Sequence, residues 1–225
     1  MTEDLINKDV SEEDLEKIFN AFLELEVEIK SESKTIFENE TKKGRLYKGS
    51  HYVFSIASRA IALNRGYYML ARADNYVTAI SLIRLQIDNC LRLYAMSLVE
   101  DPKDFYEKIL GGSELRDLSD RDGKKMTDNY LVTKLDILYP KFKLLYKNTS
   151  GFIHFSNEHI FINNNVTDIN EESFRLQTTI GDIDRLKIHE KVDYSYNMFM
   201  AGKNLFKLIK GYRLTMEKYL SEEKD

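Results

Sequence analysis

The stretch Tyr76 to Val99, YVTAISLIRLQIDNCLRLYAMSLV, decides the fold of this chain. Of its 24 residues 16 are apolar, and its only charged residues are Arg84, Asp88 and Arg92. Because residues four apart lie on the same side of an α-helix, the three charges share one face and apolar side chains cover most of the rest. The stretch therefore predicts a central helix around which the other helices pack.

The composition of the whole chain favours one large helical domain. The chain has 225 residues, of which 43% are hydrophobic and 31% charged, with 2 prolines and 10 glycines. This composition excludes disordered, collagen-like and linker-rich proteins. A domain of this length buries roughly 70% of its unfolded surface, which is enough for a substantial core. We expect a single domain over residues 1–225, with residues 1–10 as a flexible tail.

Capping residues indicate where several helices begin. Ser11, followed by Asp14, resembles a capping box and predicts a helix that continues to about residue 40. Ser50 can cap a second helix. Asp101 before Pro102 predicts the start of a short helix, because aspartate is a favoured cap and proline suits the first helical position.

The second half of the chain adds shorter elements and one long helix. Thr127 can cap a helix, and Pro140 fits as the first residue of the next one. Residues 159–180 are β-favouring around an asparagine-rich turn and predict a small hairpin or loop insertion. A long helix should run from about Val192 to Leu220. The expected fold is all-α, an up-and-down helical bundle of about six or seven helices with this small β-hairpin insertion.

Cysteine usage, hydropathy and charge exclude several classes of protein. The single cysteine, Cys90, lies among apolar residues, which favours a small core side chain and a reducing, cytoplasmic setting. The first ten residues do not resemble a secretory signal or a transit peptide. Charges interrupt every stretch of about 20 residues, so we expect no membrane partner. The net charge of −4 gives no general attraction to nucleic acid, although a local basic face is compatible with it.

The charges of the predicted central helix allow two interpretations. Arg84, Asp88 and Arg92 can form a solvated strip whose ion pairs contribute about 0.2–0.5 kcal/mol each. If the helix is covered on all sides, the same charges are buried and have to satisfy one another or line a cleft, because an unpaired buried charge costs several kcal/mol. Two arginines around one aspartate would then leave a net positive site.

The segment from Lys147 to His159 is the second candidate site. Histidine exchanges a proton near neutral pH, and two of the four histidines lie here among other polar residues. The alternative is that His154 is a hydrogen-bonded residue between helices. The spacing of histidine and glutamate fits neither zinc motif, so we expect no metal and no cofactor. The candidate residues are Lys147, Asn148, Ser150, His154 and Glu158.

These residues resemble a degenerate form of the signature of HEPN-like domains, helical bundles in which an arginine and a polar residue precede a histidine. Lys147 and Asn148 would stand in place of the arginine and the polar residue, with the six residues 148–153 between Lys147 and His154. The layout of Tyr146, Ser150, His154 and Ser156 is also similar to an uncharacterised family of helical bacterial proteins. Both resemblances cover residues 71–98 and 123–159.

The HEPN-like resemblance implies metal-independent RNA cleavage, or RNA binding without cleavage, in a toxin or antiphage defence system, by a homodimer. It implies that His154 is the general acid or base, that Lys147 stabilises phosphate charge and that Asn148 orients the histidine. From their charge, Arg84, Asp88 and Arg92 are expected to support this site, together with Ser150 and Glu158.

A basic row on the last predicted helix could add to such a site. Lys203, Lys207, Lys210 and Arg213 are spaced to lie along one face, which is most often a solvated face but could guide a phosphate backbone or bind an acidic protein. The sequence leaves open whether the protein is an enzyme. A non-enzymatic helical interaction or dimerisation module is the alternative to an RNA-cleaving or RNA-binding protein, and a small-molecule sensor is a third class.

Overall fold

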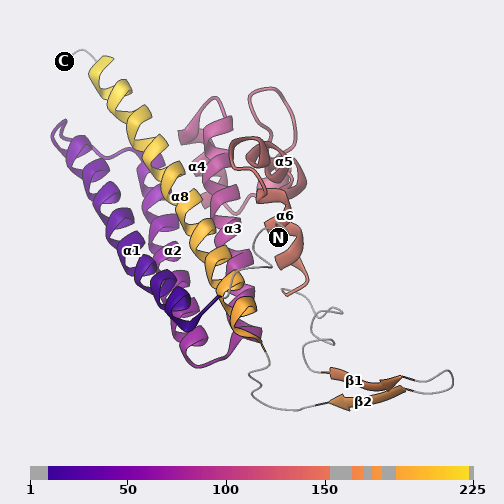
Figure 1. Ribbon diagram of the computed structural model, residues 1–225. Helices are drawn as coiled ribbons and strands as arrows, with labels where there is room; N and C mark the ends of the chain where they lie inside the picture. The colour runs from indigo at the N-terminus through magenta and orange to yellow at the C-terminus, as the bar shows by residue number, and fades with distance from the viewer. Residues whose placement is uncertain (1–9, 153–163, 170–173, 179–185, 223–225) are drawn as a thin grey trace.

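Four long helices form the body of the bundle, which Figure 1 shows from the side. The computed structural model describes residues 10–152, 164–169, 174–178 and 186–222. The last long helix packs against each of the other three. The four helices are α1 (Glu12–Thr41), α2 (Lys48–Arg72), α3 (Tyr76–Leu98) and α8 (Ile188–Glu222).

Helix α3 is the central element that the sequence predicts. It contacts α2 and α8, and it is also covered by the shorter helices. Ile80, Ile83, Ile87 and Leu91 are fully buried along it. Despite this apolar character, no helix within the described residues is both long and apolar enough to cross a membrane. The shorter helices are α4 (Pro102–Leu110), the 3-10 helix η2 (Leu115–Asp117), α5 (Asp128–Leu138) and α6 (Phe142–Ser150).

The direction of α8 depends on the chain between α3 and α8. Helices α1, α2 and α3 alternate in direction, whereas α8 runs parallel to α1 (Figure 1). Two ion pairs show this register, since Lys203 bonds with Glu28 and Arg213 bonds with Glu32. The start of α8 lies at the starting end of α3, where Lys191 bonds with Asp74, and α8 contacts both α1 and α3.

Two short strands lie between α6 and α8 in the chain. Strand β1 (Asn164–Ile169) pairs antiparallel with β2 (Phe174–Thr178), with Val166 opposite Leu176. The register shifts between Thr167 and Ile169. Both strands fall within residues 159–180, where the sequence predicts an insertion. The rest of that insertion, residues 1–9 of the tail predicted over residues 1–10, and the residues His154 and Glu158 lie outside the described residues.

Local capping predictions are confirmed where the cap lies beside its helix. The Asp14 carboxylate accepts from the backbone N–H of Ser11 at 3.1 Å, Asp101 accepts from Lys103 N at 2.8 Å, and Thr127 accepts from Tyr130 N at 3.3 Å. These are interactions over two or three residues, which the sequence displays directly.

Two predicted helix starts are wrong, the first by three residues and the second by two. Helix α2 begins at Lys48 after Tyr47, so Ser50 is inside the helix, where its hydroxyl donates to the Glu40 carboxylate. Helix α6 begins at Phe142 rather than at Pro140, because Lys141 has a left-handed backbone with φ of 75°. A residue at positive φ cannot be part of a right-handed helix, so α6 can begin only after Lys141.

Cys90 is a core residue, as its apolar surroundings predict. It is fully buried, and its Sγ donates to the carbonyl of Ala201 on α8 at 3.4 Å. Burial raises the pKa of the Cys90 thiol, which keeps it protonated. The side chain therefore joins α3 to α8 and is not poised as a nucleophile.

A pH-dependent ion pair joins α1 to α2. The Arg65 guanidinium donates through Nε to Glu26 Oε2 at 2.8 Å and through Nη2 to Oε1. These hydrogen bonds, with a smaller contribution from Lys30, lower the pKa of Glu26 from 4.5 to about 2. Since the folded pKa lies below the unfolded one, the pair stabilises the fold above the unfolded pKa, and the stabilisation is lost as the pH falls toward 2.

Replacing Glu26 by glutamine should lower the free energy of unfolding at neutral pH, because it removes the charge that pairs with Arg65. The expected loss is only about 1 kcal/mol, because Arg65 is exposed and solvent screens the pair. The deficit should shrink as the pH is lowered through the carboxyl range, where the wild-type carboxylate becomes protonated. Urea unfolding at a series of pH values measures this, with Glu24→Gln on the exposed face of α1 as the control. A deficit that is the same at all pH values would contradict the role given to the pair.

Candidate ligand-binding cleft

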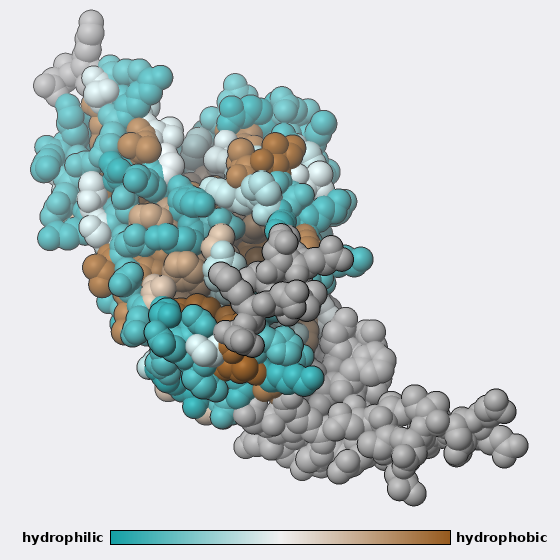
Figure 2. All heavy atoms as spheres, viewed as in Figure 1, coloured by the Kyte–Doolittle hydropathy of each residue, from teal (hydrophilic) through white to brown (hydrophobic). Residues whose placement is uncertain are grey.

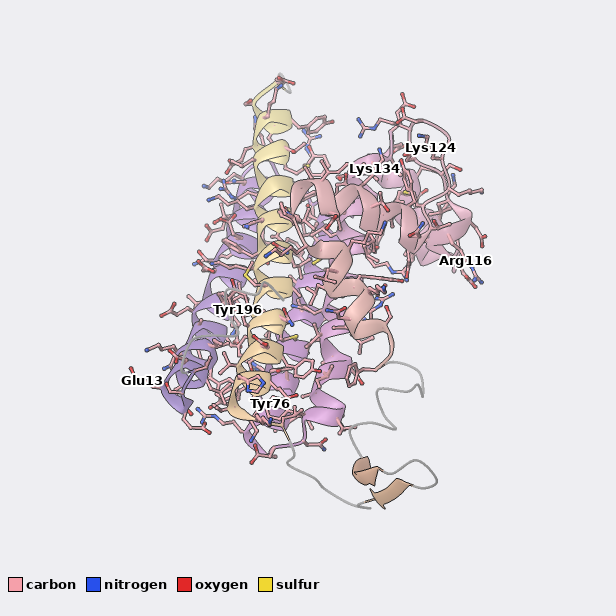
Figure 3. All side chains as sticks on the ribbon, turned by 45° about the vertical axis from the view of Figure 1, so that its right-hand side comes forward. Glu13, Tyr76, Arg116, Lys124, Lys134 and Tyr196 are labelled. Atoms are coloured by element: carbon pink, nitrogen blue, oxygen red, sulfur yellow. The ribbon has the colours of Figure 1, made fainter. Side chains whose placement is uncertain are left out.

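A cleft of about 800 Å³ opens between α2, α3, the end of α4, η2 and the start of α5. We call it the arginine cleft because arginines from three elements line it. Arg116 from η2 is one of the lining residues, and Figure 3 shows its labelled side chain extending outward from the ribbon. The polar lining includes Arg59, Asp88, Asn89, Arg92, Glu114, Arg116 and Asp128, and the apolar lining is Tyr52, Ile56, Ile109 and Leu115.

Asp88 is held between two of these arginines. Its Oδ2 accepts from Arg59 Nη1 at 3.1 Å, and its Oδ1 accepts from Arg92 Nε at 3.2 Å. The Asp88 side chain is 19% exposed, whereas the two guanidinium groups reach further into solvent. The charges of the central helix are therefore paired and half-buried, and the Asp88 group carries one excess positive charge.

A chain of buried amides fixes the position of Arg59. Arg59 Nη1 also donates to Asn89 Oδ1 at 2.5 Å, Asn89 Nδ2 donates to Gln86 Oε1 at 2.9 Å, and Gln86 Nε2 donates to Asn64 Oδ1 at 3.3 Å. All three amide side chains are buried. Each of these hydrogen bonds restricts the rotamers of the two side chains that it joins. We call these residues the amide chain; it holds one donor of Arg59 in place.

Arg84 connects the edge of the arginine cleft to α6. Its Nη2 lies 2.9 Å from Asp128 Oδ2 and 3.0 Å from the hydroxyl of Tyr146, and its guanidinium lies 4.2 Å from the centre of the Tyr146 ring. Arg84 itself does not line the cleft, but its partner Asp128 does. A planar guanidinium can stack on an aromatic ring and pair with a carboxylate at the same time. These two contacts hold the Arg84 side chain in one geometry.

The structure brings together only part of the predicted site. Asp88 and Arg92 line the cleft, whereas Lys147 and Asn148 lie exposed on α6 and are not among its lining residues. The Ser150 hydroxyl donates to the carbonyl of Tyr146 at 2.6 Å, which is a bond within α6. His154 and Glu158 lie outside the described residues, so their roles remain predictions from the sequence.

Arg59, Arg116 and Asp128 are cleft residues that the sequence analysis missed. Arg59 is 29 positions from Asp88, and Asp128 is 44 positions from Arg84. No local spacing relates residues so far apart, because periodicity reports only neighbours on the same helix. The sequence carried one signal for such residues. A mostly apolar helix with three charged side chains requires oppositely charged partners from other helices.

The basic row of α8 is partly neutralised by α1. Lys203 Nζ lies 2.5 Å from Glu28 Oε2, and Arg213 Nη1 lies 2.7 Å from Glu217 Oε1 while its Nε bonds with Glu32. Lys207 lies over the ring of Tyr139, with its Nζ 5.4 Å from the ring centre. Two of the four cations therefore join helices, which leaves the row with a weaker field than its sequence suggests.

Exposed apolar side chains gather near the turn between α5 and α6. Ile137 has the largest exposed fraction, 78%, of the large apolar side chains in the described residues, and Leu138 and Leu144 flank the same turn. Figure 2 shows brown atoms over the part of the bundle where α5 lies, on a surface that is otherwise mostly teal. Exposed apolar side chains that gather in this way are typical of interaction surfaces.

Neither a metal site nor a known relative identifies the function. Within the described ranges, no group of three or more histidine, cysteine, aspartate or glutamate side chains could hold a metal ion. Comparison with known protein families, with curated proteins and with solved structures finds no match. The case for a function therefore depends on the geometry of the arginine cleft and on the resemblance of residues 147–154.

Proposed function

We propose that this chain is a HEPN-like protein that binds RNA, and that the arginine cleft contacts the RNA phosphate. The observation that supports this is the convergence of Arg59, Arg92 and Arg116 from α2, α3 and η2 on one cleft. A guanidinium group binds phosphate through two parallel hydrogen bonds, which makes arginine the usual residue for phosphate recognition. Asp88 and the amide chain hold two of the three arginines in position before a ligand arrives.

The charge balance of the cleft limits how RNA would bind. Three arginines face three acidic residues, Asp88, Glu114 and Asp128, so the lining as a whole is close to neutral. A long basic channel would follow many phosphates and show a steep dependence on salt. This cleft favours contact with one or two phosphates, for which the slope of log affinity against log salt is about −0.7 to −1.4.

The resemblance supports cleavage of the bound RNA near His154. In this proposal His154 accepts the proton of a ribose 2′-hydroxyl, and the 2′-oxygen attacks the adjacent phosphorus. The bond from phosphorus to the 5′-oxygen of the next nucleotide breaks, and that oxygen takes a proton from water, which gives a cyclic phosphate and a 5′-hydroxyl. Lys147 would stabilise the charge on the phosphate, and Asn148 would orient the histidine. Substituting His154→Ala should abolish cleavage in the presence of EDTA while the RNA still binds.

Binding of a fluorescein-labelled single-stranded RNA tests the role of the cleft. We expect Arg59→Gln to weaken binding about tenfold, because a charge-assisted contact to phosphate contributes about 1.5–3 kcal/mol. Arg65→Gln is the matched control, since it removes the same charge from the same helix but lies against Glu26 outside the cleft. Fluorescence anisotropy at several salt concentrations gives both the affinity and the salt slope.

Two results would overturn this proposal. One is that the wild-type protein fails to bind RNA at low salt. The other is that Arg59→Gln and Arg65→Gln weaken binding equally, which would indicate a general charge effect in place of a contact in the cleft. In either case the non-enzymatic interaction module would become the preferred function.

A further inference from the structure

The arginine cleft has an apolar end and a charged end. Tyr52, Ile56 and Arg59 lie on one face of α2, and the rise of 1.5 Å per residue places Arg59 about 10 Å along the helix from Tyr52. Tyr52 is buried, with its ring edge-on to Phe105 at 5.6 Å between centres. Leu115 from η2 is also buried at the cleft. This end offers a firm apolar wall to a ligand.

The charged end presents arginine donors that the protein does not use itself. Both described hydrogen bonds of Arg59 come from Nη1, to Asp88 and to Asn89. Within the described residues, its Nε and Nη2 have no hydrogen-bonded acceptor, and the side chain is 43% exposed. Arg92 binds the other oxygen of Asp88 and lies on the facing helix. One tetrahedral oxyanion between the two guanidinium groups would satisfy these donors.

The cleft lining also carries acceptors. Glu114 and Asp128 are both exposed at the cleft. Glu114 directly precedes η2, and Asp128 lies in the first turn of α5. Carboxylates accept hydrogen bonds from hydroxyl and amino groups but repel a second phosphate. The cleft therefore matches a ligand that combines a flat apolar part, hydroxyl or amino donors and a single phosphate.

We propose that the arginine cleft binds one nucleoside monophosphate unit, with its base against Tyr52 and Leu115 and its phosphate between Arg59 and Arg92. The unit can be a free nucleotide or one residue of an RNA strand. Binding of an RNA residue rests on the proposed function, whereas binding of a free nucleotide does not. The cleft volume of about 800 Å³ lies within the usual range for small-molecule sites. The near-neutral lining agrees with one phosphate better than with a polyphosphate chain.

Isothermal titration calorimetry with AMP, adenosine and inorganic phosphate tests the two ends separately. AMP should bind at least tenfold more tightly than either half of the molecule. Arg59→Gln should abolish the preference for AMP over adenosine, and Ile109→Ser, at the apolar lining, should reduce the preference for AMP over phosphate. Arg65→Gln should leave all three affinities unchanged.

The outcomes separate this inference from the proposed function. If RNA binds and millimolar AMP does not displace it, the nucleotide site is wrong although the RNA proposal stands. If AMP binds and RNA does not, the nucleotide site is supported with a free nucleotide as its source, and the RNA proposal is wrong. If inorganic phosphate binds as tightly as AMP, the apolar end has no role and the inference is overturned.

Discussion

Replacing Glu40 by alanine should lower the free energy of unfolding by about 3 kcal/mol, because hydrogen bonds to a buried charged group contribute about 1.5–3 kcal/mol each. Glu40 is 0% exposed although it lies in the last turn of α1. Its carboxylate accepts from the backbone N–H of Tyr47 at 3.0 Å and from the hydroxyl of Ser50. The Ser50 and Tyr212 hydroxyls lie 2.8 Å apart, so the same cluster extends to α8.

The position of Glu40 explains why the expected loss is large. The carboxylate lies at the N-terminus of α2, where unsatisfied N–H groups and the helix dipole favour a negative charge. Glu38→Ala is the matched control, because Glu38 lies on the same helix and its side chain is half-exposed. Urea denaturation of both variants measures the difference. Equal effects of Glu40→Ala and Glu38→Ala would show that the buried cluster does not hold α1, α2 and α8 together.

Replacing Asp88 by asparagine should lower the free energy of unfolding by about 2 kcal/mol, and inorganic phosphate should restore most of it. The substitution removes the negative charge shared by Arg59 and Arg92 and leaves two facing, half-buried cations. The expected cost lies between that of an exposed pair and that of a fully buried one. An anion that binds between the arginines stabilises only the folded state, by about 2.7 kcal/mol at a hundredfold excess over its dissociation constant.

Thermal unfolding with phosphate, and with chloride at the same ionic strength, measures this rescue. Glu114→Gln is the control, because it removes a negative charge from the same cleft at an exposed position beside Arg116. That variant should be as stable as the wild type and should gain no more from phosphate. If Asp88→Asn unfolds like the wild type, or if phosphate stabilises all three proteins equally, Asp88 does not hold the two arginines.

The elements that the sequence predicts correctly depend on local interactions. The apolar surface of the stretch from Tyr76 to Val99 requires burial, and the apolar faces of α3 are buried while its charged face is half-buried. The caps Asp101 and Thr127 bond to residues in the first turn of their own helices. By contrast, the start of α2 at Lys48 places Ser50 beside Glu40, which belongs to the preceding helix. That contact is absent from any local pattern.

The candidate site divides in the same way. The sequence predicts Asp88 and Arg92 because they share a helix face, whereas Arg59 reaches Asp88 only after α2 and α3 pack in antiparallel directions. The expected field of the basic row is reduced because α1 places Glu28 and Glu32 beside it. The roles of His154, Lys147 and Asn148 remain predictions of the resemblance.

By itself the sequence determined that the protein is a helical bundle built around one apolar helix, because helical periodicity and caps are properties of adjacent residues. Only the tertiary structure decided which charges meet. Arg59 and Asp128 are far from Asp88 and Arg84 in the chain and come together because helix packing places α2 and α5 beside the half-buried charges of α3. The cleft, its two ends and the amide chain behind Arg59 follow from that packing.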